Sequence, residues 1–200
     1  MSLRIISGKW RGRKLALPAG DATRPTADRT RETLFSMLVS RLGSFEGLKV
    51  ADLFAGSGAL GIEALSRGAG HCLFVEQDAA AIRAIRQNLA NLQATGESDV
   101  RAGSVLGLGV AKSPLDLIML DPPYATGAGE VALEKLARLG WIGEATWISL
   151  ETMVNELPKP RGFVVESDRK VGKARITLLK LAPSEPEPSE PDLPAPDEPS

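Results

Sequence analysis

The sequence has little of the residue types on which several common kinds of chemistry depend. It contains one cysteine, Cys72, and one histidine, His71, among 200 residues. One cysteine cannot form a disulfide within the chain, and its apolar neighbours predict a buried thiol in a strand. A single histidine argues against a Ser-His-Asp triad and against a histidine-rich metal site. We therefore expect chemistry that uses neither imidazole nor a metal ion.

Long apolar runs are also missing. No stretch is apolar enough over a sufficient length to cross a membrane. The first residues reach Lys9 without the apolar region of a secretory signal. We expect a cytoplasmic protein that does not bind membranes, and the 43% hydrophobic content suits one globular domain with a sizeable core.

The end of the chain lacks basic residues altogether. Residues 183–200 hold six acidic residues and seven prolines, and this composition predicts a disordered tail to which we assign no role. Without it, 24 Lys and Arg residues face 19 Asp and Glu residues, so the body carries a net charge of +5. The overall charge of −1 therefore conceals a basic body.

Positive charge gathers near the N-terminus, where Asp21 and Asp28 are the acidic residues between positions 4 and 31. Such a cluster suits contact with a phosphate backbone, although a solvated basic surface would show the same composition. The candidate RNA-binding residues are Arg4, Lys9, Arg11, Arg13, Lys14, Arg24, Arg29 and Arg31.

Strand-like and helix-like segments alternate through the body. This alternation predicts a parallel sheet covered by helices. A last pair of strand-like segments, 163–166 and 175–181, predicts an antiparallel hairpin. The other expected strands are 48–54, 71–76, 100–105, 115–120 and 146–150, and the expected helices are 28–42, 59–67 and one capped by Asp78.

A glycine-rich loop lies between the expected strand 48–54 and the helix that follows. Gly56 and Gly58 permit a tight turn close to a ligand, and Gly61 lets the helix pack near the sheet. Glu76 ends the next strand, where a carboxylate can accept both ribose hydroxyls of an adenosine. Dinucleotide-binding proteins share this pattern, but Asp52 favours S-adenosylmethionine because its carboxylate could hold a methionine ammonium.

A second motif, Asp121-Pro122-Pro123-Tyr124, directly follows the expected strand 115–120. In an open α/β sheet this loop and the glycine loop should share one crevice. The Asp121 carboxylate and the Pro122 carbonyl can accept the two protons of an exocyclic amine and direct its lone pair at a sulfonium methyl. Tyr124 can stack on a base that has been flipped out. The motif predicts methylation of a nucleobase amine.

With these motifs, the chain resembles the RsmD family, the bacterial 16S ribosomal RNA guanine-N2 methyltransferases. The resemblance extends over about residues 3–181, and the N-terminal segments are more specific to the family than the two general motifs. The matching segments are Arg4 to Leu15, Arg24-Pro25-Thr26, Asp28-Arg29, Arg31 to Phe35, the glycine loop through Ala69, Val75-Glu76, and Asp121 to Tyr124.

The resemblance implies a Rossmann-like seven-stranded methyltransferase sheet with a small N-terminal extension of β segments and a helix. It divides the chain into an extension (1–47), a methyltransferase domain (48–182) and the tail (183–200). It also implies methylation of guanine N2 in 16S rRNA, in a small-subunit assembly intermediate, with S-adenosylmethionine as cofactor. We expect a monomer. The implied catalytic residues are Asp121, Pro122, Pro123 and Tyr124, and the implied cofactor-binding residues are Asp52, Phe54, Gly56, Gly58, Gly61, Glu76, Gln77, Ser104 and Asp121.

Two features depart from the family pattern. Ser104 stands where such enzymes commonly place Asp or Asn against the adenine amine, and the acidic tail lies outside the pattern. Three other functions stay open from the residues alone: an adenine-N6 methyltransferase acting on DNA or RNA, an NAD(P)-dependent oxidoreductase, and a non-catalytic RNA-binding assembly factor. Asp121–Tyr124 does not identify the base, and the N-terminal resemblance favours guanine.

Overall fold

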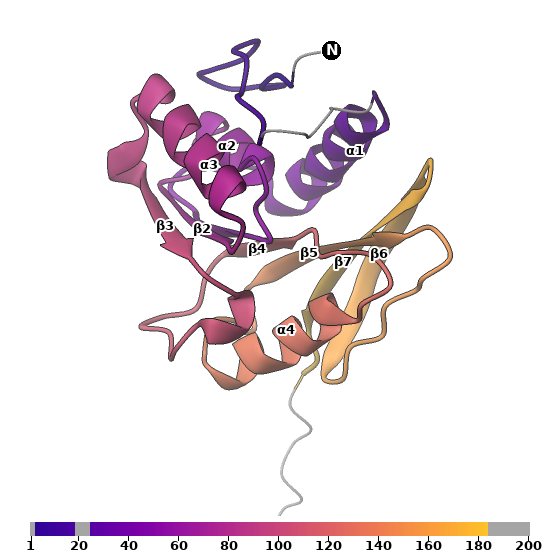
Figure 1. Cartoon of the computed structure of the whole chain (residues 1–200). Coiled ribbons are helices and arrows are strands. Elements are labelled where there is room, and N and C mark those ends of the chain that lie inside the picture. Colours follow the sequence, from indigo (N-terminus) through magenta and orange to yellow (C-terminus); the bar gives the residue numbers. More distant parts are fainter. Residues whose placement is uncertain (1–2, 19–24, 184–200) are drawn as a thin grey trace, which may run out of the picture.

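A computed structural model describes residues 3–18 and 25–183, and the predictions for Arg24 and for the tail from residue 184 lie outside this part. Figure 1 shows one sheet between two helical layers, with α1, α2 and α3 over one face and α4 over the other. The helices are α1 (Pro25–Leu42), α2 (Ala59–Ser66), α3 (Ala79–Leu92) and α4 (Ala128–Arg138), with short 3-10 turns η1 (Thr95–Glu97) and η2 (Val105–Gly107).

Within the described residues, seven strands form a mixed sheet in the order β3-β2-β1-β4-β5-β7-β6. The first five of these are parallel, and β7 pairs antiparallel with both β5 and β6. The predicted seven-stranded α/β sheet and its terminal hairpin are confirmed. The strands are β1 (Lys49–Leu53), β2 (His71–Glu76), β3 (Ser98–Ala102), β4 (Leu117–Leu120), β5 (Trp147–Met153), β6 (Phe163–Val171) and β7 (Ala174–Leu181).

The sheet separates two apolar cores because successive strand residues point to opposite faces. In β1, Val50 packs into the core beneath α1, α2 and α3, whereas Ala51 and Leu53 pack into the core with α4. Cys72 is fully buried in the first of these cores, as its apolar neighbours predicted. The second core includes Leu133 of α4.

The third strand was predicted too late in the chain. It runs from Ser98 to Ala102 instead of 100–105. It ends because Gly103 has a φ of 153° and Ser104 caps the turn η2, where its Oγ accepts from the Leu106 amide at 3.2 Å. Helix α4 was not predicted, although Leu133 and Leu136 recur at helical spacing and both are buried.

The N-terminal segment forms a loop with a single antiparallel bridge, between Arg4 and Lys14, instead of regular strands. Its apolar residues Leu3, Ile5 and Leu15 are buried in the same core as Phe35 of α1. In the described residues the extension therefore shares the apolar core beneath α1, α2 and α3.

Glu63 and Ser66 of α2 hold this N-terminal segment in place. The buried Glu63 carboxylate accepts from the Ile6 and Ser7 amides at 2.7 and 3.0 Å. The Ser66 hydroxyl donates to the Ser7 carbonyl at 2.6 Å, and a Cβ at Gly8 would lie 1.8 Å from the Ser66 carbonyl oxygen. Much of the N-terminal sequence pattern thus serves to dock the segment on α2.

Candidate active site

The two sequence motifs meet where the strand order reverses. β1 lies between β2 and β4, so the loops after β1 and β4 leave the sheet side by side and turn toward opposite faces. The Asp121 amide donates to the Leu53 carbonyl at 3.4 Å, and the Ala55 amide donates to the Val75 carbonyl at 3.1 Å. Reversal of strand order at this edge creates the crevice in which α/β proteins bind ligands.

The glycine loop between β1 and α2 depends on unusual backbone angles. Gly56 and Gly58 have φ values of 53° and 77°, and Phe54 adopts 62° although it is not a glycine. No heavy atom lies within 4 Å of a Cβ built on Gly56, so this part of the loop borders open space. Strained backbone of the kind found at Phe54 is common where a loop contacts a ligand.

Glu76, at the end of β2, lies against the same loop. Its Oε2 accepts from the Gly56 amide at 2.8 Å, while its Oε1 accepts from the Gln77 and Asp78 amides at 2.7 and 2.9 Å. Three backbone donors therefore fix the carboxylate at the mouth of the crevice. A carboxylate has about four acceptor positions, so about one remains for a ribose hydroxyl in this arrangement.

Asp52 lies beneath the loop. Its side chain is 1% exposed, and its Oδ2 accepts from the Gly61 amide at 2.8 Å. Burial raises the pKa of Asp52 to about 7, an effect that the Gly61 hydrogen bond opposes and the nearby Glu76 carboxylate reinforces. The structure thus gives Asp52 a partner at the start of α2. Its predicted contact with a methionine ammonium stays a prediction.

Gly61 and Ser104 also have defined local roles. A Cβ at Gly61 would lie 2.3 Å from the Phe74 ring and 2.6 Å from Cys72 Sγ, which confirms that a glycine is needed for α2 to approach β2. Ser104 is exposed after β3, next to the strand that Glu76 ends, and its hydroxyl accepts from Leu106. Its predicted contact with the cofactor is not tested by these bonds.

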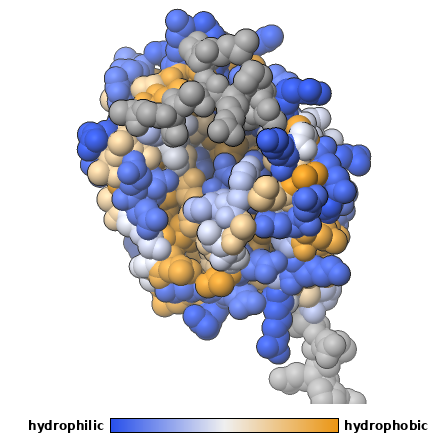
Figure 2. All heavy atoms as spheres, turned by 45° about the vertical axis from the view of Figure 1, so that its right-hand side comes forward, coloured by the Kyte–Doolittle hydropathy of each residue, from blue (hydrophilic) through white to orange (hydrophobic). Residues whose placement is uncertain are grey.

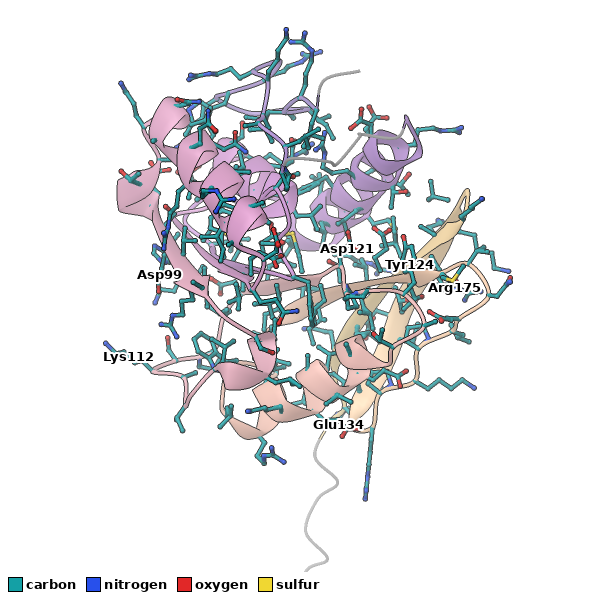
Figure 3. All side chains as sticks on the ribbon, viewed as in Figure 1. Asp99, Lys112, Asp121, Tyr124, Glu134 and Arg175 are labelled. Atoms are coloured by element: carbon teal, nitrogen blue, oxygen red, sulfur yellow. The ribbon has the colours of Figure 1, made fainter. Side chains whose placement is uncertain are left out.

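The residues that directly follow Asp121, from Pro122 to Ala125, form one wall of a cavity of about 430 Å³. The Tyr124 ring is 46% exposed, and its hydroxyl donates to Glu151 Oε1 at 2.7 Å. Figure 3 shows Asp121 and Tyr124 close together, far from Lys112 and Glu134. The cavity is lined by Pro122 to Ala125, Gly127 to Glu130, Leu150 to Thr152 and Glu156 to Pro158.

Glu151 is a site residue that the sequence analysis missed. The expected strand stopped at position 150, whereas β5 continues to Met153. Leu120 and Leu150 are register partners in β4 and β5, so Asp121 and Glu151 are the next residues of two adjacent parallel strands. A carboxylate one residue beyond an apolar strand was the available signal, since Asp121 has the same placement.

The pKa values of three neighbouring carboxyl groups, Asp52, Asp121 and Glu151, are all raised. Close packing of protein atoms around Asp121, together with the Glu151 and Asp52 carboxylates, raises the pKa of Asp121 to about 8, even though its side chain reaches solvent in the crevice. Burial likewise raises the pKa of Glu151, and the hydrogen bond from Tyr124 opposes this rise. Perturbed carboxylates beside a cavity are typical of functional sites.

Of the predicted RNA-binding residues that the structure describes, Arg31 is buried and the others are exposed. Arg31 is 5% exposed and donates to the Arg4 carbonyl and to Asp28, so it is a structural residue, and its prediction as a surface contact is wrong. Lys9 pairs with Glu97 at 2.8 Å, and Arg13 donates to the Asn91 carbonyl of α3 at 2.6 Å. Arg4, Lys9, Arg11, Arg13, Lys14 and Arg29 are all exposed.

The described residues contain no helix long and apolar enough to span a membrane, and no group of three His, Cys, Asp or Glu side chains placed to hold a metal ion. The outer face turned forward in Figure 2 shows apolar groups among hydrophilic ones. The exposed apolar residues of the described part include Tyr124 and Leu157 beside the cavity.

Comparison with known proteins agrees with this arrangement. The family model described as conserved hypothetical protein 95 matches residues 3–180. The ribosomal RNA small subunit methyltransferase D of Escherichia coli is 37% identical over 180 residues, which cover 89% of each chain. The enzyme of that name from Haemophilus influenzae is 35% identical and covers 85% of this chain and 89% of its own.

The chain is also similar to solved structures. A proposed methyltransferase of Escherichia coli, yhhF, superposes with a TM-score of 0.79 at 34% identity and covers 92% of this chain and 100% of its own. A hypothetical protein of Thermus has a TM-score of 0.70 at 28% identity and covers 90% of this chain and 99% of its own. The extension and the sheet therefore occur together in these relatives.

Proposed function

Because the chain belongs to the RsmD family of methyltransferases, we propose that it transfers a methyl group from S-adenosylmethionine to N2 of a guanine in 16S rRNA. The observation that carries this proposal is the position of Asp121-Pro122-Pro123-Tyr124 beside the glycine loop, where the Asp121 amide bonds to the end of β1. The relatives from Escherichia coli and Haemophilus influenzae that are named ribosomal RNA small subunit methyltransferase D support the choice of RNA.

The residues present fit S-adenosylmethionine. The open space above Gly56 admits a ligand against the backbone, and the fixed Glu76 carboxylate has room for a ribose hydroxyl. Phe54, Gln77 and Ser104 border the same edge of the sheet and complete the proposed binding site. The bound cofactor would supply an electrophilic methyl group; the chain's own residues would supply position and hydrogen bonds.

The Asp121 carboxylate and the Pro122 carbonyl would hold the amine in the productive orientation. An exocyclic amine is a weak nucleophile because its lone pair is delocalised into the ring. Two acceptors on its two protons favour a pyramidal nitrogen with an available lone pair. Pro123 limits the freedom of the loop, and the exposed Tyr124 ring offers a surface for stacking. Positioning of this kind accounts for much of the rate in group transfer.

We further propose that the exposed basic residues of the N-terminal segment contact rRNA phosphates, in a monomer that acts on a small-subunit assembly intermediate in the cytoplasm. Arg11 and Lys14 are the best candidates because both are exposed and none of the described hydrogen bonds or ion pairs uses their side chains. Arg4 and Arg13 instead donate to backbone carbonyls of the protein.

Mapping of the methylated base tests this proposal. Purified protein is incubated with labelled S-adenosylmethionine and small-subunit particles from cells that lack the activity, and the labelled nucleotide is identified after digestion. We expect one N2-methylguanine. Label in N6-methyladenine would contradict the choice of base, and absence of label from both particles and free 16S rRNA would indicate a non-catalytic assembly factor.

A further inference from the structure

Glu151 occupies a position that the proposed chemistry does not yet use. It follows β5 residue Leu150 as Asp121 follows β4 residue Leu120, and these two leucines are register partners. The Glu151 carboxylate is close enough to Asp121 to raise the pKa of Asp121. Glu151 lines the cavity and Asp121 directly precedes its Pro122 wall, so two carboxylates lie at this place although only one is needed to hold an amine.

The Glu151 side chain is both oriented and accessible. The Tyr124 hydroxyl donates to its Oε1 at 2.7 Å and so limits its rotation. Glu151 also lines the 430 Å³ cavity together with Tyr124. Since a carboxylate accepts several hydrogen bonds, the bond from Tyr124 leaves acceptor capacity for a ligand.

The three exocyclic amines of RNA bases differ in the ring atom beside the amine. In guanine, the N2 amine adjoins N1–H, which is a hydrogen-bond donor. In adenine and cytosine, the amine adjoins a ring nitrogen that carries a lone pair and accepts hydrogen bonds. A second carboxylate next to the amine-binding carboxylate therefore attracts guanine and repels the other two bases.

We propose that Glu151 accepts the N1–H of the target guanine and so selects guanine over adenine and cytosine. This inference rests on the proposed function and deepens it, because Asp121–Tyr124 alone does not identify the base. In this arrangement Asp121 holds the N2 amine, Glu151 holds N1–H, and Tyr124 both stacks on the base and orients Glu151. Buried polar groups left without a partner make such a site reject the wrong base.

A substrate analogue isolates this hydrogen bond. 2-Aminopurine keeps the exocyclic amine, but its N1 carries no hydrogen and is an acceptor. After the methylated position has been mapped, RNA is assembled with either guanine or 2-aminopurine at that position. Single-turnover methylation is then measured for the unaltered protein, for Glu151→Gln, and for the control Glu134→Gln, which changes an exposed carboxylate of α4.

The unaltered protein and Glu134→Gln should methylate guanine at least about tenfold faster than 2-aminopurine, the discrimination typical of paired hydrogen bonds to a base edge. Glu151→Gln should bring this ratio toward one, because a glutamine amide can accept from N1–H or donate to a bare N1. The variant is nearly isosteric, and its melting temperature serves as a check on folding.

The outcomes separate this inference from the proposed function. If Glu151 only supports Tyr124, Glu151→Gln slows both substrates equally and leaves the ratio unchanged, which would overturn the inference alone. Equal rates of methylation of guanine and 2-aminopurine by the unaltered protein would also overturn this inference alone. Mapping of the label to adenine, or to no base, would contradict the proposed function and this inference with it.

Discussion

Asp121 combines an exposed position with surroundings that favour its protonated form. Its pKa of about 8 arises from close packing first, then from Glu151 on β5 and Asp52 on β1. A protonated carboxyl group holds the amine more weakly, because an ionised carboxylate is the stronger hydrogen-bond acceptor. The activity of the free enzyme therefore depends on loss of this proton, and the balance among the three carboxyl groups sets the pH at which this occurs.

We predict that kcat/KM rises with pH and levels off above about pH 8. Well below the pKa, the rate constant should fall about tenfold for each pH unit, because the ionised fraction of Asp121 falls by that factor. In Glu151→Gln, one source of the raised pKa is absent, so the profile should move to lower pH. Rates measured between pH 6 and 9.5 test this, and a profile that Glu151→Gln leaves in place would contradict it.

Substitution of Asp121 and Tyr124 tests their separate roles. Asp121→Ala removes an interaction that strengthens as the nitrogen pyramidalises, so the rate constant should fall by roughly a hundredfold or more. Tyr124→Ala should lose about 1–3 kcal/mol of base stacking, whereas Tyr124→Phe keeps the ring and should stay largely active. Single-turnover methylation gives the rate constants, and calorimetry with S-adenosylhomocysteine should show little change in cofactor affinity. A normal rate for Asp121→Ala would refute the mechanism.

At the scale of elements, the contact between α2 and β2 holds the glycine loop in place. Gly61→Ala would put a Cβ 2.3 Å from the buried Phe74 ring, so α2 would have to shift. We expect overpacking to lower the free energy of unfolding by about 1–3 kcal/mol. Denaturant unfolding measures the change, and Gly96→Ala is the control because no heavy atom lies within 4 Å of its added Cβ. Equal stability of both variants would show that the helix adjusts without cost.

The N-terminal segment is the element that we propose for RNA. Reversal of two exposed charges in Arg11→Glu with Lys14→Glu should weaken RNA binding and reduce its salt dependence by about one unit of slope for each lost phosphate contact. Lys112→Glu with Arg138→Glu changes the charge equally on the side of the sheet that carries α4. Binding titrations at several salt concentrations compare the two double variants. Equal losses of RNA affinity in both would mean that net charge alone determines affinity.

The sequence predicted those elements whose signals are local. The strand at 71–76 matched in full, and Asp78 caps α3 by accepting from the Ala81 amide at 2.8 Å, because a cap depends on residues within one turn. Arg31 was placed wrongly because the Arg4 carbonyl to which it donates comes from a distant part of the chain. Glu151 was missed for the same reason, since only pairing of β4 with β5 places it beside Asp121.

At the scale of the whole molecule, charge is divided between a basic body and an acidic C-terminal segment. The family match ends at residue 180, and β7 ends at Leu181, where the Ala182 amide still donates to the Gly162 carbonyl at 2.8 Å. Residues 184–200, which lie outside the described part, contain six acidic residues and no basic ones. Their removal changes the net charge from −1 to +5, and every described strand ends before residue 184.

Truncation after Pro183 should therefore leave the melting temperature and the rate of methyl transfer unchanged. Nonspecific affinity for RNA should rise, and the increase should be larger at low salt, because the added attraction is between screened charges. A full-length variant in which the six acidic residues of 184–200 become amides is the matched control, and it should bind RNA as the truncated chain does. If the amide variant instead behaves like the unaltered protein, the segment acts through its length; if truncation lowers the melting temperature, it supports the fold.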